Sequence, residues 1–203
     1  MSTQEKAMQA RSDTLQQYVS DMIAIEEHIA NAVKRQAEDK DVAKNNPQAS
    51  RIIQNILQYT EQHSQHLKQH LESIGGDPAK GIKEVATSAL GAVAGMYDKI
   101  RSEQVSKMLR DDYTALNLAA VAYTMLHTTG LALQDQGTAS LALRHLQHYT
   151  PIIMELNQII PSVVVAELKD DGLNVIEGSA QQAVNNTQNA WKPSSSGNGD
   201  RTI

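Results

Sequence analysis

The sequence predicts an all-α fold, an up-and-down four-helix bundle with an extra helical segment that joins its two halves. Aromatic residues make up only 3% of the 203 residues and Phe is absent, so aliphatic residues must fill the core. That composition favours helices, because strands prefer β-branched and aromatic residues. Apolar residues also recur at helical spacing in four long segments. Each half of the chain resembles a pair of long helices, which suits a bundle with one long crossover.

The first predicted helix covers residues 13–37, after a flexible N-terminus over residues 1–12. Met22, Ile29 and Val33 lie on one apolar stripe of this helix. At 100° per residue, Glu26 falls inside the same stripe. The helical bundle as a whole is expected over residues 13–170.

The second predicted helix begins at Pro47, since Asn46 suits the N-cap and proline suits the first helical position. Gly75 and Gly76 are expected to end it. The polar stretch 37–46 before it is expected to be a solvated connection. Residues 78–105, including the Ala- and Gly-rich stretch 85–96, are expected to form one or two shorter helices.

The third predicted helix covers residues 105–134 and is apolar on two faces. One face includes Leu109 and Leu116, and the opposite face includes Val121 and Met125. A helix that is apolar on two faces is either central or covered by a partner subunit. We therefore expect a homodimer formed through the second face.

The fourth predicted helix covers residues 138–168, with Pro151 expected to kink it and Pro161 to end or kink it. Residues 171–203 are rich in Asn, Gln, Ser and Gly and are expected to be a mostly disordered tail. A short helix over 175–184 is compatible with that expectation.

Composition excludes several classes of function. The absence of Cys excludes disulfides, zinc–thiolate sites and thiol nucleophiles. A net charge of −5 does not indicate the positively charged surface that binds nucleic acid. The polar first residues lack the apolar region of a signal peptide, and no apolar run is long enough for a bilayer. We expect a soluble cytoplasmic protein without a nucleic-acid or membrane partner.

Two residues stand out as candidate metal ligands. A carboxylate within an apolar stripe is costly unless it is paired or coordinated, which makes Glu26 the best single candidate. His63 lies at the margin of the apolar stripe of the second helix. Simple hydrogen bonding of Glu26 to a neighbouring Tyr, His or Arg is the favoured interpretation, and coordination is the alternative.

Three further histidines suggest a second kind of site. His127 precedes Gly137 by ten residues and His148 follows it by eleven, so antiparallel helices would bring them to similar depth. His145 and His148 share a helix face with spacing i, i+3. Such an imidazole-rich site suits zinc, copper or nickel. The alternative is that these are satisfied core histidines, while His66 and His70 are expected on the surface.

Four stretches resemble the YciE/YciF-like branch of the ferritin-like proteins. They are DMIAIEEHIANAV, TEQHSQHL, DDYTALNLAAVAYTMLHTTGLALQDQG and SLALRHLQH, within about residues 15–165. The resemblance implies a ferritin-like bundle with a di-iron centre, and it places Glu26 and His63 on ligand positions. It also shows three departures: Tyr59, Ala119 and His148 stand where the pattern has carboxylates. Most of the implied ligand set is therefore replaced.

Three functions remain open on these grounds. The first is a ferritin-like protein with a degenerate di-iron site, non-catalytic or weakly metal-binding, of the stress-related type that the resemblance implies. The second is a His-rich metal-binding bundle with oxidase-like or metal-storage activity. The third is a helical interaction module with an unknown protein partner. The cofactor is accordingly either none or a transition metal, iron or zinc.

Overall fold

The computed structural model describes residues 2–79 and 104–192, and every regular element in these two ranges is a helix. In chain order the helices are α1 (Thr3–Ala37), α2 (Lys40–Asn45), α3 (Pro47–Ser73), α6 (Val105–Ala132), α7 (Gln136–Asp170) and α8 (Ser179–Trp191). The prediction of an all-α bundle is confirmed.

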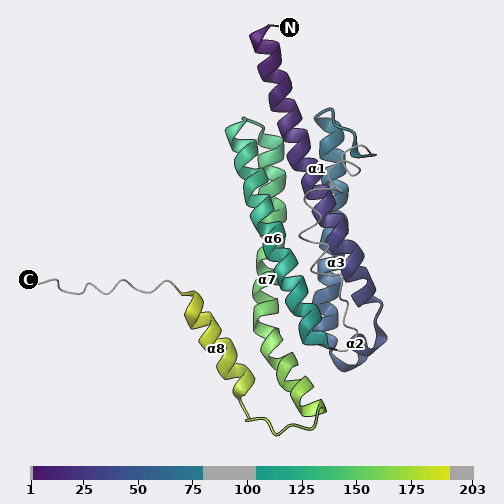
Figure 1. Ribbon diagram of the computed structural model, residues 1–203, viewed down its shortest axis with the longest axis vertical. Coiled ribbons are helices and arrows are strands. Elements are labelled where there is room, and N and C mark those ends of the chain that lie inside the picture. The colour runs from purple at the N-terminus through teal and green to yellow at the C-terminus, as the bar shows by residue number, and fades with distance from the viewer. Residues whose placement is uncertain (1, 80–103, 193–203) are drawn as a thin grey trace, which may run out of the picture.

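Four long helices form the bundle (Figure 1). The α1 helix packs mainly on α3, and α6 packs mainly on α7, while contacts between α1 and α6 and between α3 and α7 close the ring. The pairing of α1 with α6 is antiparallel, since Arg11 bonds to the carbonyl of Leu133 at 2.7 Å and Gln36 to Asp112 at 3.1 Å. In Figure 1, α3 ends at the opposite end of the bundle from the start of α6. Residues 80–103, which join α3 to α6 and carry most of the predicted crossover, lie outside the described residues.

The core is aliphatic apart from two tyrosines. Burial of such side chains stabilises the fold by roughly 1.5–3 kcal/mol each. The largest fully buried side chains are Tyr123, Tyr149, Met22, Ile23, Ile29, Ile52, Ile53, Ile56, Leu67, Leu71, Leu109 and Leu116.

The ends of α3 lie where the sequence predicts them. Pro47 occupies the first turn, where its missing N–H costs nothing, and Asn46 is the N-cap residue without a side-chain bond to the helix. After Ser73 the chain turns through Gly75, whose φ of 83° is in the left-handed region that glycine adopts without strain.

Two segments of the N-terminal half, the N-terminus and the connection before α3, differ from the prediction. Instead of a flexible stretch over residues 1–12, α1 extends back to Thr3, because Ser2 and Glu5 form a reciprocal capping box. Within the predicted solvated connection, residues 40–45 form α2, whose first main-chain N–H groups are capped by the Asp39 carboxylate.

The C-terminal half also differs in its helix ends. The α7 helix continues through Pro151 and Pro161 to Asp170, so of the two outcomes expected at Pro161, an end or a kink, the helix does not end there. Part of the predicted disordered tail is helical, since α8 covers Ser179–Trp191 rather than 175–184. Most of the expected helical segment 78–105, including 85–96, lies outside the described residues.

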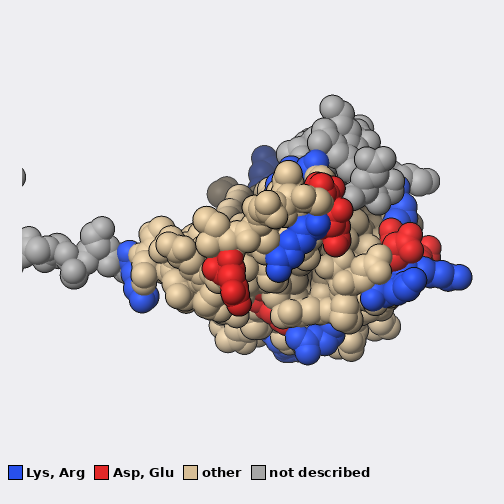
Figure 2. All heavy atoms as spheres, turned by 90° about the horizontal axis from the view of Figure 1, so that it is seen from below, with Lys and Arg blue, Asp and Glu red and all other residues tan. Residues whose placement is uncertain are grey.

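The exposed charges form small groups of mixed sign. Figure 2 looks at one end of the molecule and shows Lys and Arg beside Asp and Glu, with wide uncharged areas between them. Among the described helices, α7 is long and apolar enough to cross a membrane by length and composition. Core helices of bundles pass the same test.

Candidate functional site

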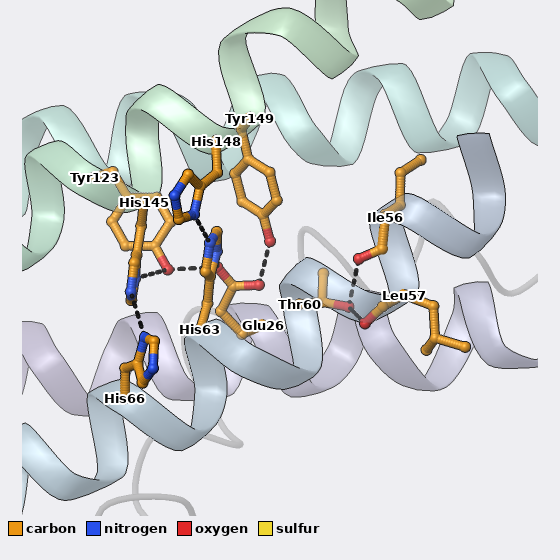
Figure 3. A network of polar contacts seen from close by, with 10 residues as sticks. All are labelled: Glu26, Ile56, Leu57, Thr60, His63, His66, Tyr123, His145, His148 and Tyr149. Carbon is orange, nitrogen blue, oxygen red and sulfur yellow. Dashed lines mark hydrogen bonds and ion pairs between the residues drawn. The ribbon is translucent and has the colours of Figure 1, made fainter. Parts of the chain in front are cut away.

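The carboxyl group of Glu26 on α1 is fully buried, and polar side chains from the other three long helices surround it. Its Oε1 atom is bonded by the hydroxyl of Tyr123 on α6 and lies 3.1 Å from Nδ1 of His63 on α3. Its Oε2 atom is bonded by the hydroxyl of Tyr149 on α7. Each of the four long helices thus contributes one side chain to the hydrogen-bonded network around this carboxyl (Figure 3).

Burial determines the protonation of Glu26. Removal of the carboxyl from water raises the pKa of Glu26 to about 8, although the bonds from Tyr123 and Tyr149 act in the opposite direction. The contact between Glu26 and His63 therefore joins two predominantly neutral groups near pH 7. It is a hydrogen bond in a low-dielectric environment rather than an ion pair.

Four histidines lie beside this carboxyl, two from α3 and two from α7 (Figure 3). Nε2 of His63 lies 3.0 Å from Nδ1 of His148, and Nδ1 of His66 lies 3.4 Å from Nε2 of His145. The rings of His63 and His145 stack in parallel, with centroids 3.9 Å apart and planes within 8°. We call His63, His66, His145 and His148 the histidine cluster.

The two inner histidines of this cluster are neutral at physiological pH. Burial, and then the proximity of His148 and His66, lowers the pKa of His63 to about 3. Burial, followed by the effect of the neighbouring rings, lowers the pKa of His145 to about 2. Burial also lowers the pKa of His148, which is only partly covered. The cluster thus presents neutral imidazoles, the form in which histidine binds metals.

His127 lies outside the cluster, contrary to the predicted site with His145 and His148. Its Nδ1 atom bonds to the carbonyl of Ala139 at 2.8 Å. His127 and His148 do not lie at similar depth, because the turn between α6 and α7 lies at residues 133–135, before Gly137. His127 therefore faces the first turns of α7, whereas Tyr123, one turn earlier on α6, bonds to His145 at 3.0 Å.

Two participants in the network were not predicted from the sequence, His66 and Tyr149. His66 was expected on the surface, but α7 half-covers it and brings it to His145. Tyr149 follows His145 by four residues on the same apolar stripe, so its position facing the centre could be inferred, but not its bond to Glu26. His70, also expected on the surface, is half-buried and its Nε2 lies 2.7 Å from the Thr138 hydroxyl.

The residues present do not fit a carboxylate-bridged di-iron centre. Such centres use a Glu from each of two helices and Glu-x-x-His motifs from the other two. Here Glu26 is the one carboxyl in the central network, and both of its oxygens are bonded by Tyr or His side chains. Ala119 is fully buried, and Tyr59 packs against His148 with centroids 4.8 Å apart. Neither position supplies a carboxylate.

In residues 2–79 and 104–192, no group of three or more His, Cys, Asp or Glu side chains is arranged to hold a metal ion. The described network is instead closed by hydrogen bonds among side chains. As it is drawn in Figure 3, each bonded ring nitrogen faces a single partner.

Comparison with known families gives one match. The model of a family described as "Domain of unknown function (DUF892)" matches residues 10–169. Searches of curated proteins and of solved structures return no match. The matched range begins in the third turn of α1 and ends in the last turn of α7, so it includes nearly all of the four long helices.

Proposed function

The chain belongs to the DUF892 family, a ferritin-like family of unknown function, and from this premise we propose that it is a member with a degenerate, non-catalytic di-iron site. Within the family we place it in the YciE/YciF-like branch. The four stretches of sequence that resemble this branch support that placement.

The bonding of Glu26 is the observation that supports the proposal best. In a di-iron bundle a buried glutamate offers its oxygens to iron. Here Tyr149 is bonded to one oxygen, and Tyr123 and His63 to the other. These side chains satisfy the buried carboxyl without a metal, which removes the cost that an unpaired buried group would carry.

The experiment is an iron titration of the full chain. Fe²⁺ is added anaerobically, air is then admitted, and iron stoichiometry and oxidation rate are measured. We expect no binding of two irons per chain, and an oxidation rate equal to that of buffer and of the Glu26→Ala variant. Saturable uptake of two irons, with rapid oxidation that Glu26→Ala abolishes, would contradict the proposal.

A second candidate is an interaction module that acts through the outer face of α6. From Tyr113 to Gln134 the chain contains no Asp, Glu, Lys or Arg. On this uncharged face Val121 and Met125 are 60% and 52% exposed. Apolar surface without charges is typical of the centre of a protein interface. We propose that a second copy of the chain covers it.

A further inference from the structure

A groove lies between α8 and the adjoining residues of α6 and α7. Its volume is about 420 Å³, within the range of small-molecule pockets, about 300–1,000 Å³. Tyr113 and Ile153 line its inner side, where both side chains pack against the core. Met154 and Trp191 also line it and are 50% and 70% exposed. The groove therefore presents apolar and aromatic surface to solvent.

The sequence of α8 explains why the groove forms at this place. Val184, Gln188 and Trp191 share one face of the helix, because they are four and three residues apart. In its first turns the half-buried residues include the small Ala180 and Ala183, which allow α8 to pack closely on α7. Towards its C-terminal end α8 diverges from α7 (Figure 1). The diverging end leaves an open space that the large indole of Trp191 lines.

This side of the groove comes from residues that the family model does not match. The match ends at residue 169, whereas α8 begins at Ser179. The connection between α7 and α8 contains Gly172 and Gly178, with φ of 77° and 78°, in the left-handed region that glycine adopts without strain. A Cβ atom added at either position would meet nothing within 4 Å. The two glycines thus set the path of the chain to α8 and do not serve close packing.

The polar groups of the groove indicate the charge of the molecule that it suits. Lys192 is the one charged residue among the described residues that line it. Its Nζ atom lies 2.9 Å from Oδ1 of Asn189, which leaves further N–H donors on the ammonium group. No carboxylate lines the groove to repel an anion, although the whole chain has a net charge of −5. The charge of the groove is therefore complementary to an acidic group.

Two amides add hydrogen-bonding capacity. The side chains of Asn157 and Gln188 line the groove, and both are half-buried. Within residues 2–79 and 104–192 neither amide forms a hydrogen bond to another residue. Each can both donate and accept. They can therefore bond to polar atoms at the edge of a bound molecule.

The apolar groups of the groove suit a flat aromatic ring. The rings of Trp191 and Tyr113 offer stacked or edge-to-face contacts, which stabilise aromatic pairs beyond the burial of their area. The thioether of Met154 offers the contact that sulfur makes with aromatic rings.

We propose that this groove binds a small, planar aromatic molecule that carries an acidic group, a carboxylate or a sulfonate. Its ring lies between Trp191 and the wall formed by α6 and α7. Its acidic group lies beside Lys192, and the amides of Asn157 and Gln188 bond to its polar edge.

This site is separate from the proposed function. It uses neither Glu26 nor the outer face of α6 at Val121 and Met125. Its failure would leave the iron titration and the proposed dimer unaffected, and either of those can fail while the groove binds its ligand.

The test is fluorescence titration of the untagged full chain with 1-anilinonaphthalene-8-sulfonate, an aromatic sulfonate whose emission rises in apolar surroundings. Trp191 is the one tryptophan of the chain, so its emission reports on the groove. We expect saturable one-to-one binding with a Kd on the order of 10 μM, as the usual affinity per ligand atom implies. Emission of Trp191 should fall as emission of the probe rises, along the same curve.

One pair of variants tests the position of the site. Met154→Asp places a carboxylate in the groove, and repulsion between like charges should weaken binding of the sulfonate by roughly tenfold or more. Met8→Asp is the matched control, at a 68% exposed methionine of α1, and should bind as the parent chain does. Both variants should melt like the parent, because both positions are exposed.

A second pair tests the acidic group. Lys192→Gln should weaken binding of the sulfonate by about two- to fivefold, the scale of one exposed ion pair. It should leave binding of N-phenyl-1-naphthylamine unchanged, since this probe has the same ring system without the sulfonate. Lys169→Gln, at an exposed position near the end of α7, should change neither affinity.

Absence of saturable one-to-one binding would overturn the proposal, as would equal weakening by Met154→Asp and Met8→Asp. Unchanged affinity of Lys192→Gln for the sulfonate would contradict the place of the acidic group. Binding that weakens as the protein concentration rises would show instead that a second copy of the chain occupies the groove.

Discussion

At the level of single residues, burial shifts the pKa values of the central carboxyl and imidazoles in opposite directions. The pKa of Glu26 rises to about 8 because its charged form is desolvated, and the pKa of His63 falls to about 3 for the same reason. Both groups become neutral in the folded state. The unfolded chain keeps the ordinary values, so stability must depend on pH.

The first prediction concerns this pH dependence. Above pH 6.5 the folded chain holds the Glu26 proton that the unfolded chain has lost, so the free energy of unfolding falls towards pH 8, by about 1 kcal/mol per pH unit. Below pH 6.5 the unfolded chain protonates His63 and His145, which stay neutral in the fold, so stability falls towards acid as well. We expect maximal stability near pH 6.5 in urea denaturation.

Glu26→Gln isolates one side of this profile. The amide keeps the shape of the neutral acid and cannot ionise, so the decline between pH 6.5 and pH 8 should disappear while the acid side remains. Glu61→Gln, at an exposed position of α3, is the control and should leave the profile unchanged. An alkaline decline that persists in Glu26→Gln would show that another group causes it.

At the level of elements, local chemistry explains which boundaries the sequence could predict. Pro47 and Gly75 mark the ends of α3, because each has a conformational reason to stand there. The start of α1 could have been predicted as well, since Ser2 and Glu5 have the spacing of a capping box. The α8 helix could be predicted only in part: a short helix was compatible with residues 175–184, but α8 covers Ser179–Trp191 and has no buried residue that would mark its ends.

The second prediction concerns the contact between α6 and α7. A Cβ atom added at Gly130 would lie 2.6 Å from the main-chain nitrogen of Ala139 and 2.9 Å from its Cα. Main-chain atoms cannot turn aside as a side chain does, so the helices must separate. We expect Gly130→Ala to lower the free energy of unfolding by about 1–3 kcal/mol, despite the better helix propensity of Ala.

Gly137→Ala is the matched control for that substitution. Its added Cβ would meet the His70 ring at 3.2 Å, and a side chain of that kind can shift. We expect a change within about 0.5 kcal/mol. Equal destabilisation by the two substitutions would mean that the close approach at Gly130 does not hold α6 against α7.

At the level of the whole molecule, the all-α bundle could be predicted, but the site only in part. Apolar periodicity within each helix indicates which residues point inward, and it identified Glu26 correctly. It contains no information on the rotation of one helix against another. His66 was therefore assigned to the surface, although α7 half-covers it, and His127 was assigned to the wrong depth.

The third prediction concerns the contribution of α8. This helix lies along α7 but buries none of its residues (Figure 1). Since stability follows buried apolar area, a chain ending at Asp171 should unfold within about 0.5 kcal/mol of the full chain. Thermal and urea denaturation measure this difference. A loss of several kcal/mol would mean that α8 belongs to the cooperative fold.

The fourth prediction concerns the proposed dimer. Val121→Glu with Met125→Glu places two charges on the uncharged outer face of α6, where burial against a second copy would desolvate them. We expect light scattering after size exclusion to show a dimer for the parent chain and a monomer for this variant. Met8→Glu, at a 68% exposed position of α1, should stay dimeric.

A monomeric parent chain, or a double variant that remains dimeric, would contradict that assignment of the face. Melting of each variant should be followed alongside, because the two positions are exposed in the single chain and their replacement should leave the fold intact.

The neutral Glu26 also makes folding a proton-transfer reaction. Just above neutrality the collapsing chain must take up a proton from solvent to bury this carboxyl, whereas below pH 6.5 it must release protons from His63 and His145 before they are enclosed. The heat of refolding should therefore depend on the ionisation enthalpy of the buffer. That dependence should change sign at the pH where uptake and release balance.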